Sequence, residues 1–133
     1  MIFAGINYLA VAVAAVVGFA VGMIWYRIFA PQWMAALGKT RAELAPRPRP
    51  FVIAIVAQLL MAYILAGAIG HMGAVDIHTG VVSAAFIWLG FIATTIVINH
   101  SFQGLPTALI LIDAGHWLAV MVIMGAVIGF FGV

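Results

Sequence analysis

The residues of this sequence best suited to chemistry are polar side chains that interrupt long apolar stretches. Asp113 lies about eight residues into the last such stretch, and His116 follows at i+3, on the same face of a helix. An acid at that depth costs about 2.5–3.5 kcal/mol to insert into a bilayer, so intramembrane acids usually have a function and a partner. The pair therefore predicts either a protonatable site or a polar contact between helices.

Three more polar side chains are expected at a similar depth. If the apolar stretches are helices, Asp113 lies about 12 Å and Gln58 about 10 Å from the same membrane boundary. Thr95 and Asn99 fall on one helical stripe with Trp88. The sequence thus predicts one intramembrane polar cluster made of Gln58, Thr95, Asn99, Asp113 and His116, bordered by Arg27 and His100.

Two interpretations of this cluster stay open. In the first, Asp113 and His116 form a protonatable site for a proton-coupled or small-solute pathway. In the second, the cluster is a set of interhelical hydrogen bonds, which is the commoner use of Gln, Thr and Asn in membrane helices. We favour the second for Gln58, Thr95 and Asn99, and interpret His116 as a satisfied core histidine unless it pairs with Asp113.

The elements that must position these residues are membrane helices. Of the 133 residues, 68% are apolar and 6% are charged, whereas a soluble domain is about half apolar and a quarter charged. A small soluble fold cannot bury so much apolar side chain, because its surface is large for its volume. This composition excludes a cytoplasmic enzyme, a nucleic-acid module and a disordered tail. The absence of Cys excludes disulfides and Cys-ligated metals.

Four stretches are long and apolar enough to cross a bilayer, which takes about 20 helical residues. They cover residues 5–26, 51–70, 80–98 and 106–131. Each must be helical, because unpaired backbone groups are too costly in lipid. The predicted fold is all-α, an integral membrane four-helix bundle that forms a single membrane domain over residues 1–133.

The basic residues predict the orientation of the bundle across the membrane. All five Lys and Arg residues lie in the segment 27–50. By the positive-inside rule this loop is cytoplasmic, so both termini face outward. We therefore expect a multi-pass membrane protein whose loop 27–50 is cytoplasmic. The residues expected at the interface with lipid headgroups are Trp25, Tyr26, Arg27, Trp33, Lys39, Arg41, Arg47 and Arg49.

Local motifs subdivide this basic loop. Pro31 suits the first turn of a short interfacial helix and Gly38 suits its end. Thr40 and Glu43 have the spacing of a capping box, and Pro-Arg-Pro-Arg-Pro at 46–50 predicts a stiff, extended strut. We interpret the loop as a tether to anionic headgroups, each Lys or Arg adding about 1 kcal/mol, in preference to a docking site for a partner protein.

Small residues recur every four positions on one face of two spans, which lets another helix backbone approach closely. They are Ala10, Ala14, Gly18 and Gly22 in the first span, and Gly125 and Gly129 in the last. Packing inside the bundle and homo-oligomerisation both fit this pattern. Four spans leave much helix surface facing outward, so we expect an oligomer or a larger host assembly.

No metal, cofactor or catalytic site is predicted. His71, Asp76 and His78 lie near one turn but lack a fourth ligand, while His100 and His116 lie at other depths. The three acids are far apart, and there is no Ser-His-Asp order or phosphate-binding glycine loop. We therefore expect a protein without enzymatic activity.

Two groups of motifs follow the order and spacing of a known family. The first is Gly-Met-Ile-Trp-Tyr at 22–26, then Phe29, Trp33-Met34 and Leu37-Gly38. The second is Asn99-x-x-Phe102-x-Gly104, followed by the segments 111–115 and 123–126. Together they resemble the DUF1761 family of small four-span bacterial membrane proteins of unknown function. The resemblance covers nearly the whole chain except the Pro-Arg loop. It implies the four-span fold and a location in a bacterial inner (plasma) membrane, but no reaction.

Three functional classes follow from these observations. The first is a non-enzymatic accessory or structural subunit of a homo- or hetero-oligomeric membrane assembly, with the lipid bilayer, copies of itself or other membrane subunits as partners. The second is a small homo-oligomeric, proton-coupled transporter or channel that uses Asp113 and His116. An enzyme acting on a lipid or a quinone ranks last. Nucleic acid is not an expected partner, because the few basic residues adjoin the membrane.

Overall fold

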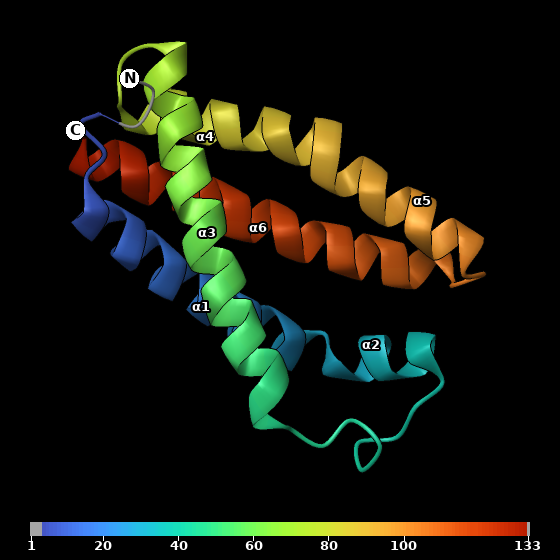
Figure 1. Cartoon of the computed structure of the whole chain (residues 1–133). Coiled ribbons are helices and arrows are strands. Elements are labelled where there is room, and N and C mark those ends of the chain that lie inside the picture. The colour runs from blue at the N-terminus through green and yellow to red at the C-terminus, as the bar shows by residue number, and fades with distance from the viewer. Residues whose placement is uncertain (1–3, 133) are drawn as a thin grey trace.

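The computed structural model describes residues 4–132, so residues 1–3 and 133 of the predicted unit lie outside the described part. It contains four helices long and apolar enough to cross a membrane (Figure 1). These are α1 (Tyr8–Ile28), α3 (Pro48–Met72), a third span over Ile77–Phe102 and α6 (Thr107–Phe131). They match the predicted spans to within four residues at each end. The prediction of an all-α, four-helix membrane bundle is confirmed.

The third span is not one regular helix. It consists of α4 (Ile77–Ile87), a π-helical segment η1 (Trp88–Ala93) and α5 (Thr94–Phe102). A π turn holds one more residue than an α turn, and such turns are frequent at functional sites. The consequence of this turn for the polar residues is described with the site below.

The predicted short helix in the basic loop is confirmed as α2 (Ala30–Leu37). Pro31 lies in its first turn, and Gly38 ends it with a φ of 65°. This left-handed conformation carries no steric cost for glycine, and it lets the N–H groups of Gly38 and Lys39 bond back to the last turn. The capping-box spacing is also used, since Thr40 N–H donates to Glu43 Oε2 at 2.7 Å and Glu43 N–H donates to Thr40 Oγ1 at 3.4 Å.

The extended strut predicted for residues 46–50 is wrong in its second half. The helix α3 begins at Pro48, so Pro48 and Pro50 belong to its first turn. Proline is tolerated there because the first N–H groups of a helix have no intrahelical partner and the ring fixes φ near the helical value. The second span is therefore longer at its basic end than the apolar pattern alone indicates.

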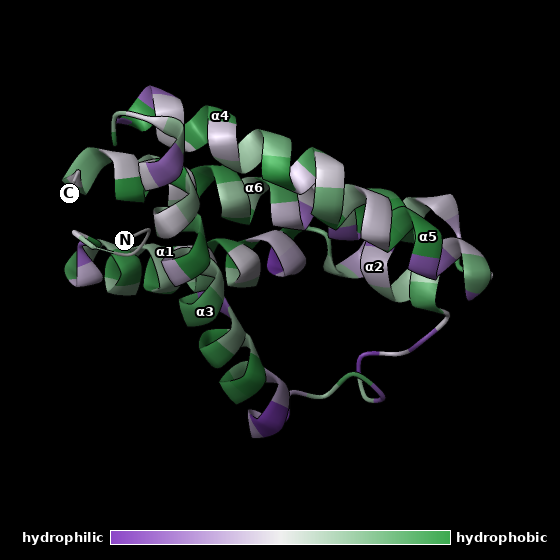
Figure 2. Ribbon diagram, turned by 45° about the horizontal axis from the view of Figure 1, so that its top comes forward, coloured by the Kyte–Doolittle hydropathy of each residue, from purple (hydrophilic) through white to green (hydrophobic). Residues whose placement is uncertain are grey.

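The central element of the bundle is α6, which packs against α1 and α4 along much of its length. Figure 1 shows that α4 and α5 run alongside α6, whereas α3 crosses it steeply. The start of α1, the end of α6 and the α3–α4 turn lie together at one end. Figure 2 shows hydrophilic residues gathered in the segment between α2 and α3 and at the start of α3. The bundle therefore has one basic end and one nearly uncharged end.

Glycines allow α4 and α6 to touch backbone to backbone. A Cβ on Gly80 would overlap the carbonyl oxygen of Gly125, and a Cβ on Gly129 would overlap the backbone of Asp76. Side chains larger than hydrogen at these positions would push the two helices apart. Gly125 and Gly129 are therefore packed inside the bundle in this structure.

The small-residue face of α1 is also turned inward. Ala10 and Ala14 are at most 1% exposed, and Gly18 and Gly22 are buried as well. Ala14 belongs to the apolar core that α1, α3, α4 and α6 share, while the two glycines lie against polar side chains described below. In this structure the face packs within the chain and leaves none of its four small residues on the surface.

Candidate functional site

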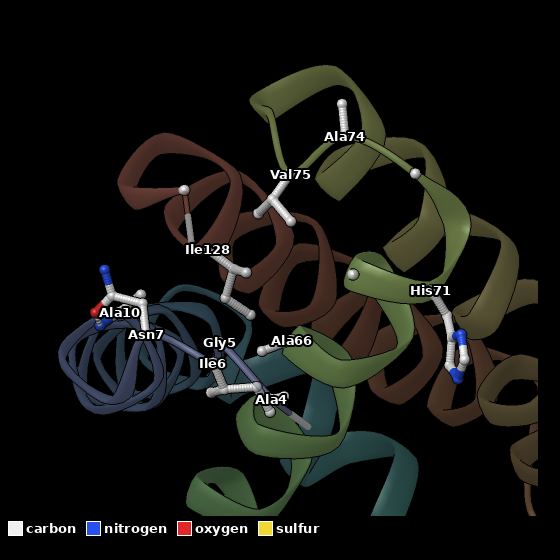
Figure 3. Close-up of a pocket in the computed structure, with 13 residues that line it drawn as sticks. Ala4, Gly5, Ile6, Asn7, Ala10, Ala66, His71, Ala74, Val75 and Ile128 are labelled. Atoms are coloured by element: carbon white, nitrogen blue, oxygen red, sulfur yellow. Dashed lines mark hydrogen bonds between the residues drawn. The ribbon is translucent and has the colours of Figure 1, made fainter. Parts of the chain in front are cut away.

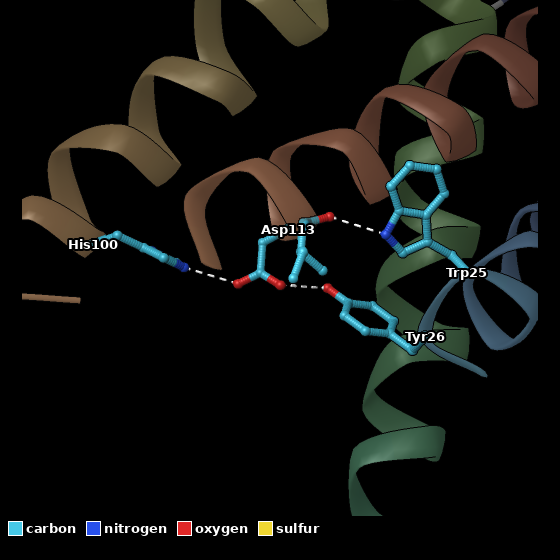
Figure 4. A network of polar contacts seen from close by, with 5 residues as sticks. Trp25, Tyr26, His100 and Asp113 are labelled. Atoms are coloured by element: carbon cyan, nitrogen blue, oxygen red, sulfur yellow. Dashed lines mark hydrogen bonds and ion pairs between the residues drawn. The ribbon is translucent and has the colours of Figure 1, made fainter. Parts of the chain in front are cut away.

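Asp113 lies at the junction of three helices. Its Oδ1 accepts a hydrogen bond from the Tyr26 hydroxyl of α1 at 2.7 Å, and its Oδ2 lies 2.8 Å from Nε2 of His100 on α5. Figure 4 shows the two partners approaching the carboxylate from opposite sides. Both side chains of the His100–Asp113 pair are less than one-fifth exposed. A carboxylate inside the apolar part of α6 is thus satisfied by one group from each of two other helices.

Two indoles hold the backbone of α6 on either side of Asp113. Trp25 Nε1–H of α1 donates to the carbonyl of Ile112 at 3.0 Å, and Trp88 Nε1–H donates to the carbonyl of Ala114 at 2.8 Å. A membrane interior offers no water to these N–H groups, so a carbonyl of a neighbouring helix is the available acceptor. Trp25 also requires Gly115, where a Cβ would lie 2.8 Å from its ring. The indoles therefore fix the depth of Asp113 relative to its neighbours.

The π-helical turn decides which residue of the third span reaches Asp113. One extra residue in a turn rotates everything after it by about 100° relative to an uninterrupted α-helix. Trp88, the first residue of the π segment, bonds to α6, and His100, twelve positions later, also contacts α6. The half-buried positions of this face follow a spacing of four, namely Trp88, Ile92, Ile96 and His100.

Thr95 and Asn99, which we expected in the cluster around Asp113, lie outside it. Both are exposed on α5, and Thr95 donates its hydroxyl hydrogen to the carbonyl of Phe91 one turn earlier. The expected stripe of Trp88, Thr95 and Asn99 assumes a regular α-helix. The π turn breaks that register, turning Thr95 and Asn99 outward and bringing His100 to the carboxylate. His100 was expected at the border of the cluster and is instead its direct member.

Gln58 and His116 lie against the glycines of α1. They are 4% and 6% exposed, and each faces one glycine of the small-residue face. Gln58 Oε1 lies 2.9 Å from the position of a Cβ on Gly18, and His116 Nε2 lies 2.8 Å from that of a Cβ on Gly22. Each glycine thus makes room for one polar side chain. Gln58 Oε1 and His116 Nδ1 have no hydrogen-bond partner within residues 4–132.

These two side chains line a cleft of about 760 Å³ between α1, α3 and α6, with α2 and the basic loop at its mouth. Its walls are mainly apolar, and the aromatic residues among them are Phe19, Tyr26, Trp33, Phe51 and Trp117. Arg27 lies at the same cleft. Asp113 is not part of the lining, but Tyr26 lines the cleft and bonds to Asp113. The cleft and the carboxylate are therefore connected through one hydroxyl.

The residues expected at the lipid interface divide into two groups. Trp25 and Tyr26 are half-buried and direct their polar atoms to α6, and the Trp33 ring lies 5.3 Å from that of Tyr26. These aromatic residues were expected at the lipid headgroups, and the periodicity of the sequence carries no signal of their bonds to α6. The basic residues are all exposed, as an interfacial position requires: Arg27, Lys39, Arg41, Arg47 and Arg49.

A cavity of about 530 Å³ lies at the opposite end of the bundle, between residues 4–7, the α3–α4 turn and the end of α6 (Figure 3). Figure 3 shows the His71 side chain pointing away from Val75 and Ile128. Asp76 caps α4, and the hydrogen bond from Thr79 N–H holds the pKa of its carboxyl below the usual value. Within residues 4–132, no three His, Cys, Asp or Glu side chains lie close enough to hold a metal ion.

A comparison with protein families places most of the chain in one of them. A family model described as "Protein of unknown function (DUF1761)" matches residues 9–129, which is most of the chain. No curated protein and no solved structure matches it.

Proposed function

The chain belongs to the DUF1761 family, and we propose that it is a non-enzymatic accessory or structural subunit that assembles in the membrane with copies of itself or with other membrane subunits. The observation that carries this proposal is the outer face of the third span, formed by Gly90, Thr94, Thr95 and Asn99. All four residues are exposed. The proposal accounts for a polar, small-residue face on a helix that otherwise exposes large apolar side chains.

This outer face has the features by which membrane helices associate. A Cβ on Gly90 would have no atom within 4 Å, so the backbone of η1 is open to a close approach. Thr94 and Thr95 bond to carbonyls of their own helix, whereas Asn99 makes no side-chain hydrogen bond within residues 4–132. Small residues and interhelical amide bonds drive association in lipid, because the hydrophobic effect does not operate between helices there.

The distribution of burial supports the same proposal. In the most apolar 18-residue stretch of the third span, 11% of the residues are buried. The corresponding share in α6 is 44%. The third span is thus the least covered of the four. The Asp113 network also fits a structural role, because both carboxylate oxygens are occupied by side chains of neighbouring helices.

The proposal includes the membrane and its sidedness. We place the protein in a bacterial inner (plasma) membrane with the basic loop 27–50 in the cytoplasm, because all five Lys and Arg residues lie there. The chain has no Cys, so single cysteines report sidedness cleanly. In intact cells, a membrane-impermeant maleimide should label Ala74→Cys and leave Lys39→Cys unlabelled. The opposite pattern would overturn the orientation.

Disulfide crosslinking in membranes tests the assembly through this face. We expect Thr94→Cys to form a crosslinked species on mild oxidation, because the outer face lies against another subunit. Val52→Cys is the matched control, since Val52 is 60% exposed on α3, away from that face. Equal crosslinking of both variants would indicate random collision, and no crosslink at Thr94 would contradict contact between copies of the chain through this face.

A small homo-oligomeric, proton-coupled transporter or channel is the second candidate. The observation that favours it is the position of Tyr26, which both lines the cleft and bonds to Asp113. In this second candidate, Asp113 and His116 bind and release the transported proton. Asp113→Asn in a folded, assembled protein separates the two candidates. Loss of proton-driven flux would favour transport, and an unchanged phenotype would favour the accessory role.

A further inference from the structure

The cleft between α1, α3 and α6 contains two polar groups that the fold leaves unsatisfied. Gln58 and His116 are both more than nine-tenths buried, and both line the cleft. Gln58 Oε1 and His116 Nδ1 lack hydrogen-bond partners within the described part of the chain. An unpaired buried polar group costs about 1–3 kcal/mol, so two of them beside one cleft point to a ligand.

The spacing of the two groups limits the size of that ligand. Gln58 lies at Gly18 and His116 lies at Gly22, and these glycines are one helical turn apart on α1. These four residues correspond to a rise of about 6 Å along the helix. Two side chains this close together can bond to two oxygens of one small ring.

The residues that line the cleft suit a ligand with a flat, uncharged ring. Aromatic side chains come from α1, α2, α3 and α6, and the rings of Phe19 and Phe51 pack edge to face with centroids 6.2 Å apart. Within this lining the only permanently charged side chain is Arg27, which is exposed. Ligand pockets with apolar, aromatic walls and a few polar groups fix a ring by packing and orient it by hydrogen bonds.

We propose that this cleft binds a lipid-soluble quinone or quinol, with its ring oxygens at Gln58 and His116 and its tail directed to the lipid. The amide and the imidazole can each donate or accept a hydrogen bond, so both the carbonyl form and the hydroxyl form of the ring are accommodated. The inference goes beyond the proposed assembly and does not depend on it, because no residue of the third span lines the cleft.

Binding is tested on the purified full chain in nanodiscs of neutral lipid, with decylubiquinone as the probe and the rise in unfolding temperature as the readout. A ligand that binds only the folded state raises this temperature in a saturable way. We expect saturable binding to the wild type and binding weakened about five- to tenfold in Gln58→Leu and in His116→Phe. Gln103→Leu, which removes an exposed amide outside the cleft, is the matched control and should bind as the wild type does.

A second variant keeps the test decisive if the polar substitutions perturb folding. Ala54 lines the cleft, and Ala54→Trp fills it without removing either polar group. We expect this variant to fold with wild-type helix content and to lose binding. The proposal is overturned by absence of saturable binding to the wild type, or by equal binding in Ala54→Trp. Stabilisation by phosphatidylglycerol that depends on Arg27 and not on Gln58 would overturn it too, because the occupant would then be an anionic lipid.

Discussion

Nε2 of His100 lies 2.8 Å from Oδ2 of Asp113, and the two residues sit on consecutive helices joined by a short turn. The other carboxylate oxygen accepts from Tyr26 of α1, so one side chain ties α1, α5 and α6 together at the basic end of the bundle. In lipid each of these groups would otherwise lack a partner. The contact explains how an acid is accommodated in a helix that crosses the membrane.

Replacing Asp113 should therefore loosen that end of the bundle. Asp113→Leu removes the acceptor of both Tyr26 and His100, and we expect a loss of about 1–3 kcal/mol in the free energy of unfolding. Asp113→Asn keeps one acceptor oxygen, so its free energy of unfolding should fall by less than that of Asp113→Leu. Reversible unfolding in detergent, followed by circular dichroism, measures both variants. A Leu variant as stable as the wild type would show that the network does not hold the helices together.

The contact between Gly80 and Gly125 makes a second prediction. Gly125→Ala places a methyl group against the backbone of α4, and we expect overpacking to cost about 1–3 kcal/mol. Gly70→Ala is the matched control, because a Cβ there meets no atom within 4 Å. The same unfolding measurement compares them. Equal stability of the two variants would mean that α4 and α6 do not pack this closely.

The fold was predictable from the sequence because lipid leaves few choices. Apolar length places the four spans, and the left-handed glycine at Gly38 ends α2 as expected. The strut at 46–50 was mispredicted, since proline composition indicates extended chain while the first turn of a helix accepts proline equally well. The aromatic residues at the end of α1 were expected at the lipid headgroups, but their bonds to α6 depend on helix rotation, which apolar length does not give.

The candidate site was only partly predictable. Asp113 was singled out from its type and depth, yet its partners Tyr26 and His100 were not assigned to it. For Tyr26 the missing information is the rotation of α1 about its axis. For His100 the reason is the π turn at Trp88–Ala93, for which the sequence has no distinctive signal. In a regular α-helix, Asn99 would face Asp113. Because the π turn holds one extra residue, His100 takes that position instead.

The π turn itself can be tested by deletion. Removing Phe91, which is 73% exposed, should convert the π turn to α-helix and leave His100 facing Asp113. Removing Val97 from the regular helix α5 should rotate His100 by about 100° and break the contact. We expect the Phe91 deletion to unfold near the wild-type temperature and the Val97 deletion to unfold earlier. The reverse order would contradict the assigned register.

The capped carboxylate of Asp76 predicts a dependence on pH. The hydrogen bond from Thr79 N–H lowers its pKa below the ordinary 3.8, so the cap stabilises the fold fully above that value and is lost as pH falls through the folded-state pKa. Asp76→Asn keeps an acceptor but does not titrate. Between about pH 5 and pH 2, the wild type should lose more stability than this variant. Parallel pH curves for the two would refute the assignment.

Native mass spectrometry of the protein in nanodiscs formed directly from its own membrane tests the central claim most directly. We expect assemblies that contain more than one 14.1 kDa chain, or one chain with a stoichiometric second subunit. Gly90→Ile should reduce them, because it fills the open backbone of the outer face, and Gly70→Ile, at an equally open glycine on α3, should not. A single 14.1 kDa chain without any partner would contradict the account.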